Sequence, residues 1–210
     1  MIAGIMAAGN HPLLERCVRS VMEICDSMVI RIDKNVASED TIAIIRRCVR
    51  PGDIVFGSDK KWNTTIWRRE LLGALIQSGM NPDIVVALDH DEEFDDGAIE
   101  EIAAFKASDR RAMMFSYVSP MPTDDGRIVI GGRAYPDRPH MKVFKYQRNL
   151  TYNPYHGYAI INPYADKKLH WMALTKIRHF SLWNKDLESE KKSWIRKIYG
   201  KKLVRRVYGK

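Results

Sequence analysis

Short apolar runs alternate with segments of helical hydrophobic spacing along the first half of the chain. The apolar runs have the length of β-strands and cover residues 2–7, 28–32, 53–56 and 84–88. Apolar residues recur three and four positions apart, as in α-helices, over residues 13–24, 42–49 and 62–77. Ser38 offers an N-cap to the second of these helices. Strands that alternate with helices are typical of βαβ units, so the pattern predicts an α/β fold with a mostly parallel sheet flanked by helices.

The second half follows a different pattern. Residues 113–118 form another strand-like run, and residues 127–130 follow the turn signal Asp125-Gly126, which predicts a hairpin. Four prolines interrupt the stretch that follows, namely Pro136, Pro139, Pro154 and Pro163. We therefore expect a loop-rich second half. After Trp183 the pattern becomes that of a basic, amphipathic C-terminal helix.

Composition and charge are those of a globular domain with a basic tail. The chain has 210 residues, 45% hydrophobic and 29% charged, which suits one domain with a sizeable core. Of the net charge of +8, +7 lies between Lys185 and Lys210, where ten basic residues accompany three acidic ones. The rest of the chain is nearly neutral, which does not suggest nucleic acid as its partner. The tail at 184–210 predicts contact with an anionic surface such as a membrane.

The compartment follows from what the sequence lacks. No apolar run reaches about 18 residues, the length that a transmembrane helix needs. The N-terminus has no basic start of the kind that opens a secretion signal. Cys17, Cys25 and Cys48 are an odd number without metal-like spacing, so we expect free thiols in a reducing compartment. The prediction is a cytoplasmic protein that the tail can hold at the periphery of a membrane.

The most specific feature is a cluster of acids after the fourth apolar run. Asp89, Asp91, Glu92 and Glu93 fall within five positions directly after residues 84–88. In open α/β sheets, ligands bind beyond the carboxyl ends of the strands. Four carboxylates there repel one another unless a cation is near, and magnesium or manganese suits hard oxygen ligands. The cluster therefore predicts a divalent-metal site, provided that the chain turns at residue 90 so that both aspartates can approach one ion.

A simpler interpretation assigns the acids to a helix N-terminus. Glu92, Glu93, Asp95 and Asp96 precede a helical pattern over 96–105, and acids near that end favour the helix dipole. We expect such a role for Asp95 or Asp96. It does not account for Asp89, which follows the strand directly.

With these residues the chain resembles the family 2 glycosyltransferases of the GT-A fold, whose Asp-x-Asp motif binds a metal. It is most similar to a bacterial group with the motif Asp-Ala-Asp-Glu, often in enzymes of the lipopolysaccharide-core or O-antigen type. Here the motif reads Asp89-His90-Asp91-Glu92. Weaker matches extend to about residue 183: Asp33, Ser38-Glu39-Asp40-Thr41, Trp62, Arg68 or Arg69, Tyr135-Pro136-Asp137, Lys142-Val143-Phe144-Lys145, His156 and His179.

The resemblance implies a domain organisation and a reaction. Residues 1–183 would be one GT-A domain, with a nucleotide-binding half at 1–108 and an acceptor half at 109–183. The enzyme would move a sugar from a nucleotide-sugar, UDP-linked by expectation, to a hydroxyl of a saccharide or lipid-linked acceptor, with inversion. Manganese or magnesium would be its cofactor, and nucleic acid is not an expected partner.

The resemblance also implies a role for each matched residue. Asp33, Trp62, Arg68 or Arg69, and Asp89 would contact the nucleotide-sugar. Asp91 would hold the metal, Asp89 would help through water or ribose, and His179 would be a further metal ligand near the diphosphate. His156 lies in an aromatic stretch suited to a sugar ring and would contact the acceptor.

Three departures from the family pattern bear on the mechanism. Asn10-His11 stands in place of Asn-Glu-Glu, Lys34-Asn35-Val36 replaces a small or acidic stretch, and Gly157 follows His156 where relatives have Glu. The last change removes a candidate acid. An inverting transfer needs a general base for the acceptor hydroxyl, and Glu93 and Asp137 are the candidates that we name.

Two other classes of function compete with this interpretation. A nucleotidyltransferase also holds nucleotides with metal-bound acids at strand ends, but such enzymes have a Gly-rich loop after the first strand. Residues 7–12 read Ala-Ala-Gly-Asn-His-Pro, with one glycine. The second alternative is a non-enzymatic module that binds nucleic acid or another anionic surface through the basic tail.

Overall fold

A computed structural model of the chain describes residues 1–60, 64–118, 120–122, 128–130, 139–152, 161–162, 164 and 166–180. The strands of its main sheet are β1 (Ile2–Ala8), β2 (Ser27–Asp33), β3 (Ile54–Ser58), β4 (Ile84–Asp89), β5 (Glu92–Phe94), β6 (Ala112–Val118), β9 (His140–Lys145) and β12 (His170–His179). Two small antiparallel pairs join β7 (Pro120–Pro122) to β8 (Ile128–Ile130), and β10 (Thr151–Tyr152) to β11 (Ile161–Asn162). The helices are α1 (Leu14–Ile24), α2 (Glu39–Cys48), α3 (Thr64–Gln77), α4 (Ala98–Ala107) and the short 3-10 helix η1 (Lys167–Leu169).

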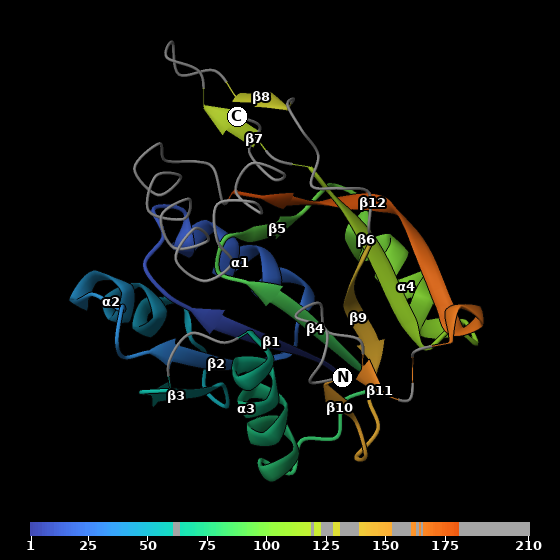
Figure 1. The fold of residues 1–210 in the computed structure, drawn as a ribbon, viewed down its shortest axis with the longest axis horizontal. Helices are drawn as coiled ribbons and strands as arrows, with labels where there is room; N and C mark the ends of the chain where they lie inside the picture. Colours follow the sequence, from blue (N-terminus) through green and yellow to red (C-terminus); the bar gives the residue numbers. More distant parts are fainter. Residues whose placement is uncertain are drawn as a thin grey trace, which may run out of the picture.

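The main sheet is mixed and mostly parallel. Its strand order is β3-β2-β1-β4-β9-β6-β12-β5 (Figure 1). Strands β3, β2, β1 and β4 are parallel to one another, and β12 is parallel to β6. Strands β9 and β5 run antiparallel to their neighbours. The predicted α/β fold with a mostly parallel sheet is confirmed, and one sheet contains strands from both halves of the chain.

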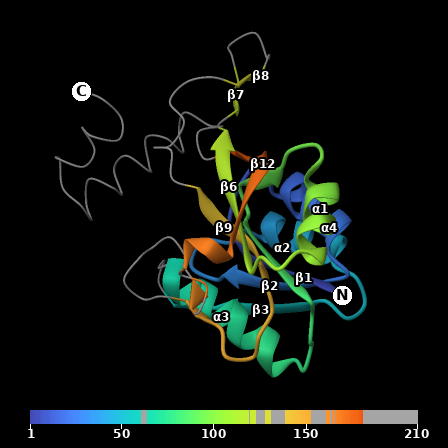
Figure 2. The ribbon, with the colours of Figure 1, turned by 90° about the vertical axis from the view of Figure 1, so that its right-hand side faces the viewer.

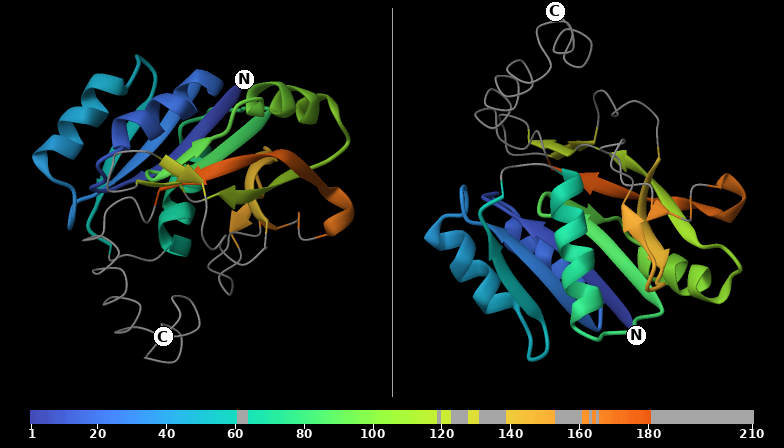
Figure 3. Two further views of the ribbon diagram at one scale, coloured as in Figure 1. Left: turned by 90° about the horizontal axis from the view of Figure 1, so that it is seen from above. Right: turned by 60° about the horizontal axis from the view of Figure 1, so that its bottom comes forward.

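Helices cover both faces of the sheet. Helices α1, α2 and α4 lie on one face and α3 on the other, as Figure 2 and the left view of Figure 3 show. The two faces have separate hydrophobic clusters. The first contains Leu14 and Val18 of α1, Ile45 of α2, and Ile102 and Phe105 of α4. The second contains Trp67, Leu71 and Leu75 of α3.

Strand β4 is apolar from Ile84 to Leu88 because both of its faces are covered. Ile84, Val86 and Leu88 enter the first cluster, while Val85 and Ala87 enter the second. Alternate side chains of a strand point to opposite faces, so a strand between two helical layers must be apolar throughout. This burial fixes the register in which β4 ends at Asp89.

The helix starts differ in how well the sequence predicted them. Ser38 caps α2 as expected: its side chain accepts a hydrogen bond from the backbone N–H of Thr41 at 3.2 Å. Helix α4 has no side-chain cap, and the expected interaction of Asp95 or Asp96 with its dipole stays a prediction. That helix starts after Gly97, which has φ of 84° and no side-chain cap, and Asp95 forms an ion pair with Arg178 instead. The tight left-handed turn that Gly97 permits replaces a capping carboxylate.

The second half contains more strand than the sequence pattern suggested. The hairpin expected near 127–130 is present as β7 and β8. Strand β12 spans ten residues but was not predicted, because the exposed Met172 and Leu174 hide its alternation of apolar and polar positions. None of the helices in the described ranges has the length and apolarity that membrane crossing requires.

Candidate functional site

The acidic cluster lies in a turn between β4 and β5. Strand β4 pairs with β1 so that Asp89 lies beside Ala7, at the carboxyl ends of both strands. The chain turns at His90 and Asp91 and then enters β5 at Glu92. The turn at residue 90 is therefore present, as the metal hypothesis required. The four acids point towards different partners, which set the geometry of the site.

Two cations from other elements bind the Asp89 carboxylate. Its Oδ2 accepts a hydrogen bond from Arg68 Nη2 at 3.0 Å and lies 3.4 Å from Lys142 Nζ. The side chains of Arg68 and Lys142 are 11% and 1% exposed and that of Asp89 is 32% exposed, so water screens these charges only in part. Burial acts to raise the pKa of Asp89, but Lys142 and Arg68 outweigh it and hold that pKa well below its usual range. Asp89 is therefore a carboxylate at neutral pH.

A buried arginine of β2 holds helix α3 in the position that brings Arg68 to this turn. Arg31 Nε donates to Glu70 Oε2 at 2.7 Å, and the Arg31 guanidinium lies 4.8 Å from the centre of the Trp67 ring. Arg31 itself is fully buried. Residues on both sides of Arg68 are thus fixed to the sheet, which leaves Arg68 directed at Asp89.

The sequence could not choose between Arg68 and Arg69, and the structure separates them. Arg69 Nη2 donates to the backbone oxygen of Tyr152 at 3.2 Å. Arg69 therefore holds the end of β10 against α3, while Arg68 belongs to the acidic turn. Burial acts to lower the pKa of Arg68, but Asp89 raises it above its usual value, so the cation is permanent.

Glu92 is the most deeply buried acid of the turn, at 1% exposure. Its Oε2 accepts hydrogen bonds from the backbone N–H of Asp89 at 2.9 Å and from Lys142 Nζ at 2.5 Å. Its Oε1 accepts the hydroxyl of Tyr117 at 2.7 Å. Burial and the carboxylates of Glu92 and Asp89 raise the pKa of Tyr117 well above its usual value, so the phenol keeps the proton that it donates.

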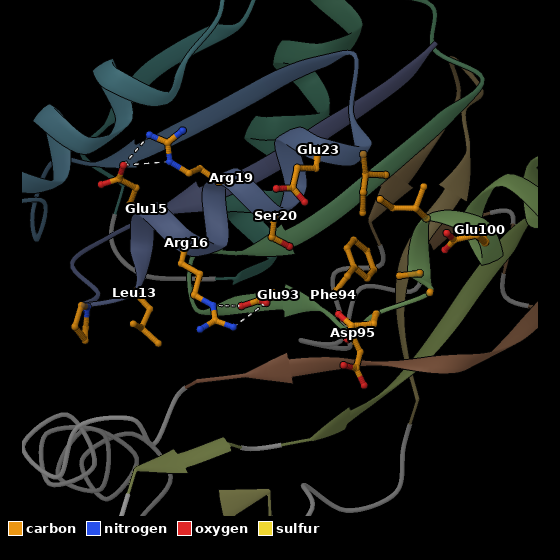
Figure 4. Close-up of a pocket in the computed structure, with 16 residues that line it drawn as sticks. Leu13, Glu15, Arg16, Arg19, Ser20, Glu23, Glu93, Phe94, Asp95 and Glu100 are labelled. Atoms are coloured by element: carbon orange, nitrogen blue, oxygen red, sulfur yellow. Dashed lines mark hydrogen bonds and ion pairs between the residues drawn. The ribbon is translucent and has the colours of Figure 1, made fainter. Parts of the chain in front are cut away.

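Glu93 is directed towards helix α1. Its carboxylate binds Arg16 Nε at 2.5 Å and Arg178 Nη1 at 3.2 Å. The Arg16–Glu93 pair borders a cleft of about 760 Å³ between α1 and the start of α4 (Figure 4). Of the described residues, Asp89, Asp91 and His179 do not line this cleft. The candidate base Glu93 is thus held by two guanidinium groups beside a different depression of the surface.

Asp91, just before β5, and His179, at the end of the neighbouring strand β12, lie side by side. Asp91 Oδ2 lies 3.2 Å from His179 Nε2, and both side chains are mostly buried, at 16% and 13% exposure. The end of β12 brings His179 to the turn, because it pairs with β5 and the Phe180 N–H donates to the backbone oxygen of Asp91 at 2.8 Å. A carboxylate and an imidazole 3.2 Å apart fit neighbouring positions around one divalent ion, whose ligands stand about 3 Å apart when each is about 2.1 Å from it. Among the described residues, no group of three or more such side chains gathers around one point.

Aromatic rings continue the site from His179. The Tyr117 ring stacks on His179 with centroids 5.1 Å apart and on His140 with centroids 4.4 Å apart. Lys142 Nζ lies 5.7 Å from the centre of the same ring. Burial, reinforced by the charges of Lys142 and Arg68, lowers the pKa of His140 to about 4. His140 is therefore neutral at physiological pH.

Tyr117, His140 and the role of Lys142 were missed by the sequence analysis. Tyr117 lies near the end of β6, His140 is the first residue of β9, and Lys142 is the third. A pattern of polar residues at strand ends could have indicated them. The sequence could not show that these residues meet at one site, because β6 and β9 are neighbours only in the folded sheet.

Two further histidines lie beside the turn. His90 Nδ1 is 3.1 Å from the backbone oxygen of Ala7. His11 Nδ1 accepts the N–H of Leu13 at 3.2 Å, and Nε2 lies 3.3 Å from the oxygen of Phe180. Burial lowers the pKa of His11. His11 therefore joins the loop after β1 to the end of β12 in its neutral form.

Asp33 ends β2, where the resemblance implied a nucleotide contact. It is 2% exposed, and its Oδ1 accepts hydrogen bonds from the backbone and side-chain nitrogens of Asn35 at 3.0 and 3.1 Å. Arg31 Nη1 lies 3.9 Å from Oδ2. Asp33 thus closes the turn after β2, in the sheet where β1 and β4 run parallel to that strand.

Repulsion among the acids, which the sequence suggested a metal must relieve, is relieved by side chains of the protein. Protein cations compensate the cluster: Arg68 and Lys142 bind Asp89, Lys142 binds Glu92, and Arg16 and Arg178 bind Glu93, while His179 contacts Asp91. The acids do not need a divalent ion to fold side by side. Within the acidic turn, the Asp91–His179 pair has the composition and spacing of metal ligands. The remaining candidates, Trp62, Asp137 and His156, lie outside the described residues.

Comparison with known proteins supports the fold. No protein-family model matches the sequence, and no curated protein matches it significantly. A Bacillus anthracis protein assigned as a glucose-1-phosphate thymidylyltransferase superposes with a TM-score of 0.50 and 14% identity, over 94% of this chain and 96% of that one. The 4-diphosphocytidyl-2C-methyl-D-erythritol synthase of Anaerococcus prevotii has a TM-score of 0.42 and 15% identity, over 69% and 70%. TarS from S. aureus, residues 1–349, has a TM-score of 0.45 and 13% identity, over 65% and 38%.

These structures, like this chain, have an α/β fold. At these identities the likeness concerns the fold alone. The chain therefore has an α/β fold with a mixed, mostly parallel sheet flanked by helices, and this fold is similar to that of the Bacillus anthracis protein.

Proposed function

We propose that this chain is a metal-dependent glycosyltransferase. It would move a sugar from a nucleotide-sugar, UDP-linked by expectation, to a hydroxyl of a saccharide or lipid-linked acceptor, with inversion. The observation that supports the proposal most is the pairing of Asp91 with His179 at 3.2 Å, next to Asp89 and Arg68 at the carboxyl end of β4. Ligands of open α/β sheets bind beyond this end of the strands.

The nucleotide would lie across the ends of β2 and β4. Asp33 and Asp89, which end these strands, would accept hydrogen bonds from ribose or base groups. Arg68, already ionised and held by Asp89, would face the diphosphate with its remaining N–H donors. Trp62 would lie near the nucleotide, and His156 would contact the acceptor.

Manganese or magnesium would be held by Asp91 and His179, with Asp89 close by. When bound, such an ion supplies a Lewis acid that stabilises the charge of the departing diphosphate. The protein then contributes only part of a six-coordinate shell, so metal and nucleotide are expected to bind together. An imidazole ligand favours manganese over magnesium.

The protein's own cations have a role in the same step. Arg68 and Lys142, which are themselves mostly buried, bring two positive charges to Asp89, whose side chain is 32% exposed. Preorganised charges of this kind stabilise a developing anion without reorganisation. Of the two candidate bases, Glu93 is occupied by Arg16 and Arg178, so we favour Asp137 for deprotonation of the acceptor.

A nucleotidyltransferase is the second candidate, and the fold comparison favours it. The structure that matches over 94% of this chain is assigned to that class. Against it stands the loop after β1, which has a single glycine and is tied down by Asn10 and His11. Asn10 accepts hydrogen bonds from the backbone of Ser38 and the hydroxyl of Thr41, at 2.8 and 2.6 Å. A loop fixed in this way is a poor cradle for a triphosphate.

The experiment that tests the proposal measures ligand binding and then the released product. Thermal-shift screening of nucleotides and nucleotide-sugars, with and without manganese, identifies the donor, because ligands that bind only the native state raise its melting temperature. A glycosyltransferase releases nucleoside diphosphate, and a nucleotidyltransferase releases pyrophosphate. Asp91→Asn should abolish the effect of manganese on nucleotide binding. Full turnover in excess EDTA would contradict the metal requirement, and pyrophosphate release would select the second candidate.

A further inference from the structure

Glu92 connects three separate elements through one buried carboxylate. Its partners are the backbone N–H of Asp89 at the end of β4, Lys142 of β9 and the hydroxyl of Tyr117 of β6, at 2.9, 2.5 and 2.7 Å. Glu92 is 1% exposed, so each of these hydrogen bonds is shielded from water. A carboxylate that receives three donors in the interior fixes the relative positions of the groups that donate.

Each donor in turn touches a residue of the candidate site. The Asp89 N–H belongs to the residue whose carboxylate binds Arg68, and Lys142 also lies 3.4 Å from Asp89 Oδ2. The Tyr117 ring stacks on His179, which contacts Asp91. Glu92 is thereby linked to the nucleotide side of the site through Asp89 and to the metal side through Tyr117.

We infer that Glu92 is a positioning residue that sets where His179 stands relative to Asp89. The inference rests on the proposed function, since it concerns the same site. Glu92 does not contact the substrate or the metal. It acts through the Tyr117 hydroxyl, which fixes the plane of the ring that His179 stacks on, and through the Asp89 N–H, which closes the turn.

The chemistry of the three donors requires a carboxylate at this position. Both oxygens of Glu92 accept, Oε2 from two donors and Oε1 from one. A glutamine keeps the shape of the side chain but carries no charge, and its single carbonyl oxygen can accept from Asp89 and Lys142. Its NH₂ group would then face the Tyr117 hydroxyl, which accepts a hydrogen bond only by turning its own proton away, so Glu92→Gln reverses that contact and leaves Lys142 without the charge of Glu92.

Glu101 provides a matched control. It is also a glutamate that receives several donors, because its carboxylate accepts from Trp171 Nε1, the N–H of Leu174, and both the N–H and hydroxyl of Thr175. These donors belong to the first part of β12, and none of them is a residue of the candidate site. A general loss of stability should follow from both substitutions, whereas a loss of positioning should follow from Glu92→Gln alone.

The test is a calorimetric titration of manganese into the UDP-saturated protein, below the melting temperature of every variant. The variants are Glu92→Gln, Tyr117→Phe, the two combined, and Glu101→Gln. Substitutions behind the direct ligands of a metal site weaken metal affinity by about 10- to 100-fold. We expect a loss of this size for Glu92→Gln and a smaller loss for Tyr117→Phe. The manganese affinity of the double variant should be within about twofold of that of Glu92→Gln, because both changes interrupt the same contact between Glu92 and Tyr117. The manganese affinity of Glu101→Gln should be within about twofold of that of the wild type.

The outcomes separate this inference from the proposed function. If the wild type binds manganese and UDP while Glu92→Gln and Tyr117→Phe bind manganese within twofold of it, the inference is wrong and the proposed function stands. If Glu101→Gln weakens manganese as much as Glu92→Gln, the effect is one of general stability and the inference is also wrong. A wild type that binds neither manganese nor any nucleoside diphosphate overturns both. Should Glu92→Gln fail to fold, Tyr117→Phe decides: a clear loss of manganese affinity supports the inference, and wild-type affinity overturns it.

Discussion

Replacement of Lys142 by methionine removes the positive charge between Glu92 and Asp89. Lys142 is 1% exposed, and its ammonium lies 2.5 Å from Glu92 Oε2 and 3.4 Å from Asp89 Oδ2. Methionine has a similar volume, so the change leaves the packing largely intact. What remains is the Glu92 carboxylate, buried and still bound by two neutral donors but without its counter-ion.

The size of the effect follows from this burial. Removing one partner of a buried ion pair costs about 3–5 kcal/mol, because the other charge stays desolvated and uncompensated. Domains of this size have unfolding free energies of about 5–15 kcal/mol, so the loss is a large part of the total. With a shift of about 2–4 °C per kcal/mol, the melting temperature of Lys142→Met should fall by roughly 6–20 °C.

A second variant distinguishes loss of the pair from loss of the lysine. Replacing Lys142 by methionine and Glu92 by glutamine removes both charges, while the glutamine keeps a carbonyl oxygen for the Asp89 N–H and an NH₂ group for the Tyr117 hydroxyl, so Glu92 no longer leaves a buried charge without its counter-ion. Urea unfolding at pH 7 should therefore show a stability for the double variant that is well above that of Lys142→Met. If Lys142→Met loses less than about 1 kcal/mol, or the double variant is no more stable than the single one, the ion pair is not the source of stability described above.

Three further predictions concern the metal, pH and the tail. His179→Ala should weaken the binding of manganese and of nucleotide together, and wild-type manganese affinity in the nucleotide-bound variant would leave His179 a packing residue. Burial and nearby cations lower the pKa of His140 to about 4 in the folded protein, against about 6.5 for an ordinary histidine. The neutral imidazole therefore contributes stability that is fully present above a pH of about 6.5 and is lost as the pH falls towards 4. His140→Phe should thus show a smaller loss of unfolding free energy between pH 7 and pH 5 than the wild type, and an equal loss would contradict the assignment. The residues after Lys185 carry most of the net charge, so a protein without them should still bind nucleotide but should lose affinity for anionic vesicles. The expected loss of binding free energy is about 1 kcal/mol for each basic residue near the vesicle surface. Unchanged vesicle binding in co-sedimentation would refute this.

The sequence by itself determined the α/β fold and the location of the acidic turn. Strand β4 could be recognised because a strand covered on both faces must be apolar at each position, from Ile84 to Leu88. Asp89 at its end was recognised for the same reason, since a carboxylate directly after such a strand has no role in the core. The N-cap Ser38 was also readable, because capping depends on residues three positions apart.

Only the tertiary structure decided which groups share the site. Arg68, Lys142 and Tyr117 lie 21, 53 and 28 positions from Asp89 in the chain, and no local pattern joins them. Their meeting depends on the strand order of the sheet, in which β9 lies between β4 and β6. Local spacing showed four acids and suggested a repulsion that a metal must relieve, whereas long-range pairing supplies a cation for three of them and His179 for Asp91. Electrostatic interactions depend on the distance between charges in space. The arrangement of the strands therefore decides which charges compensate one another, and the sequence alone gives only their number and sign.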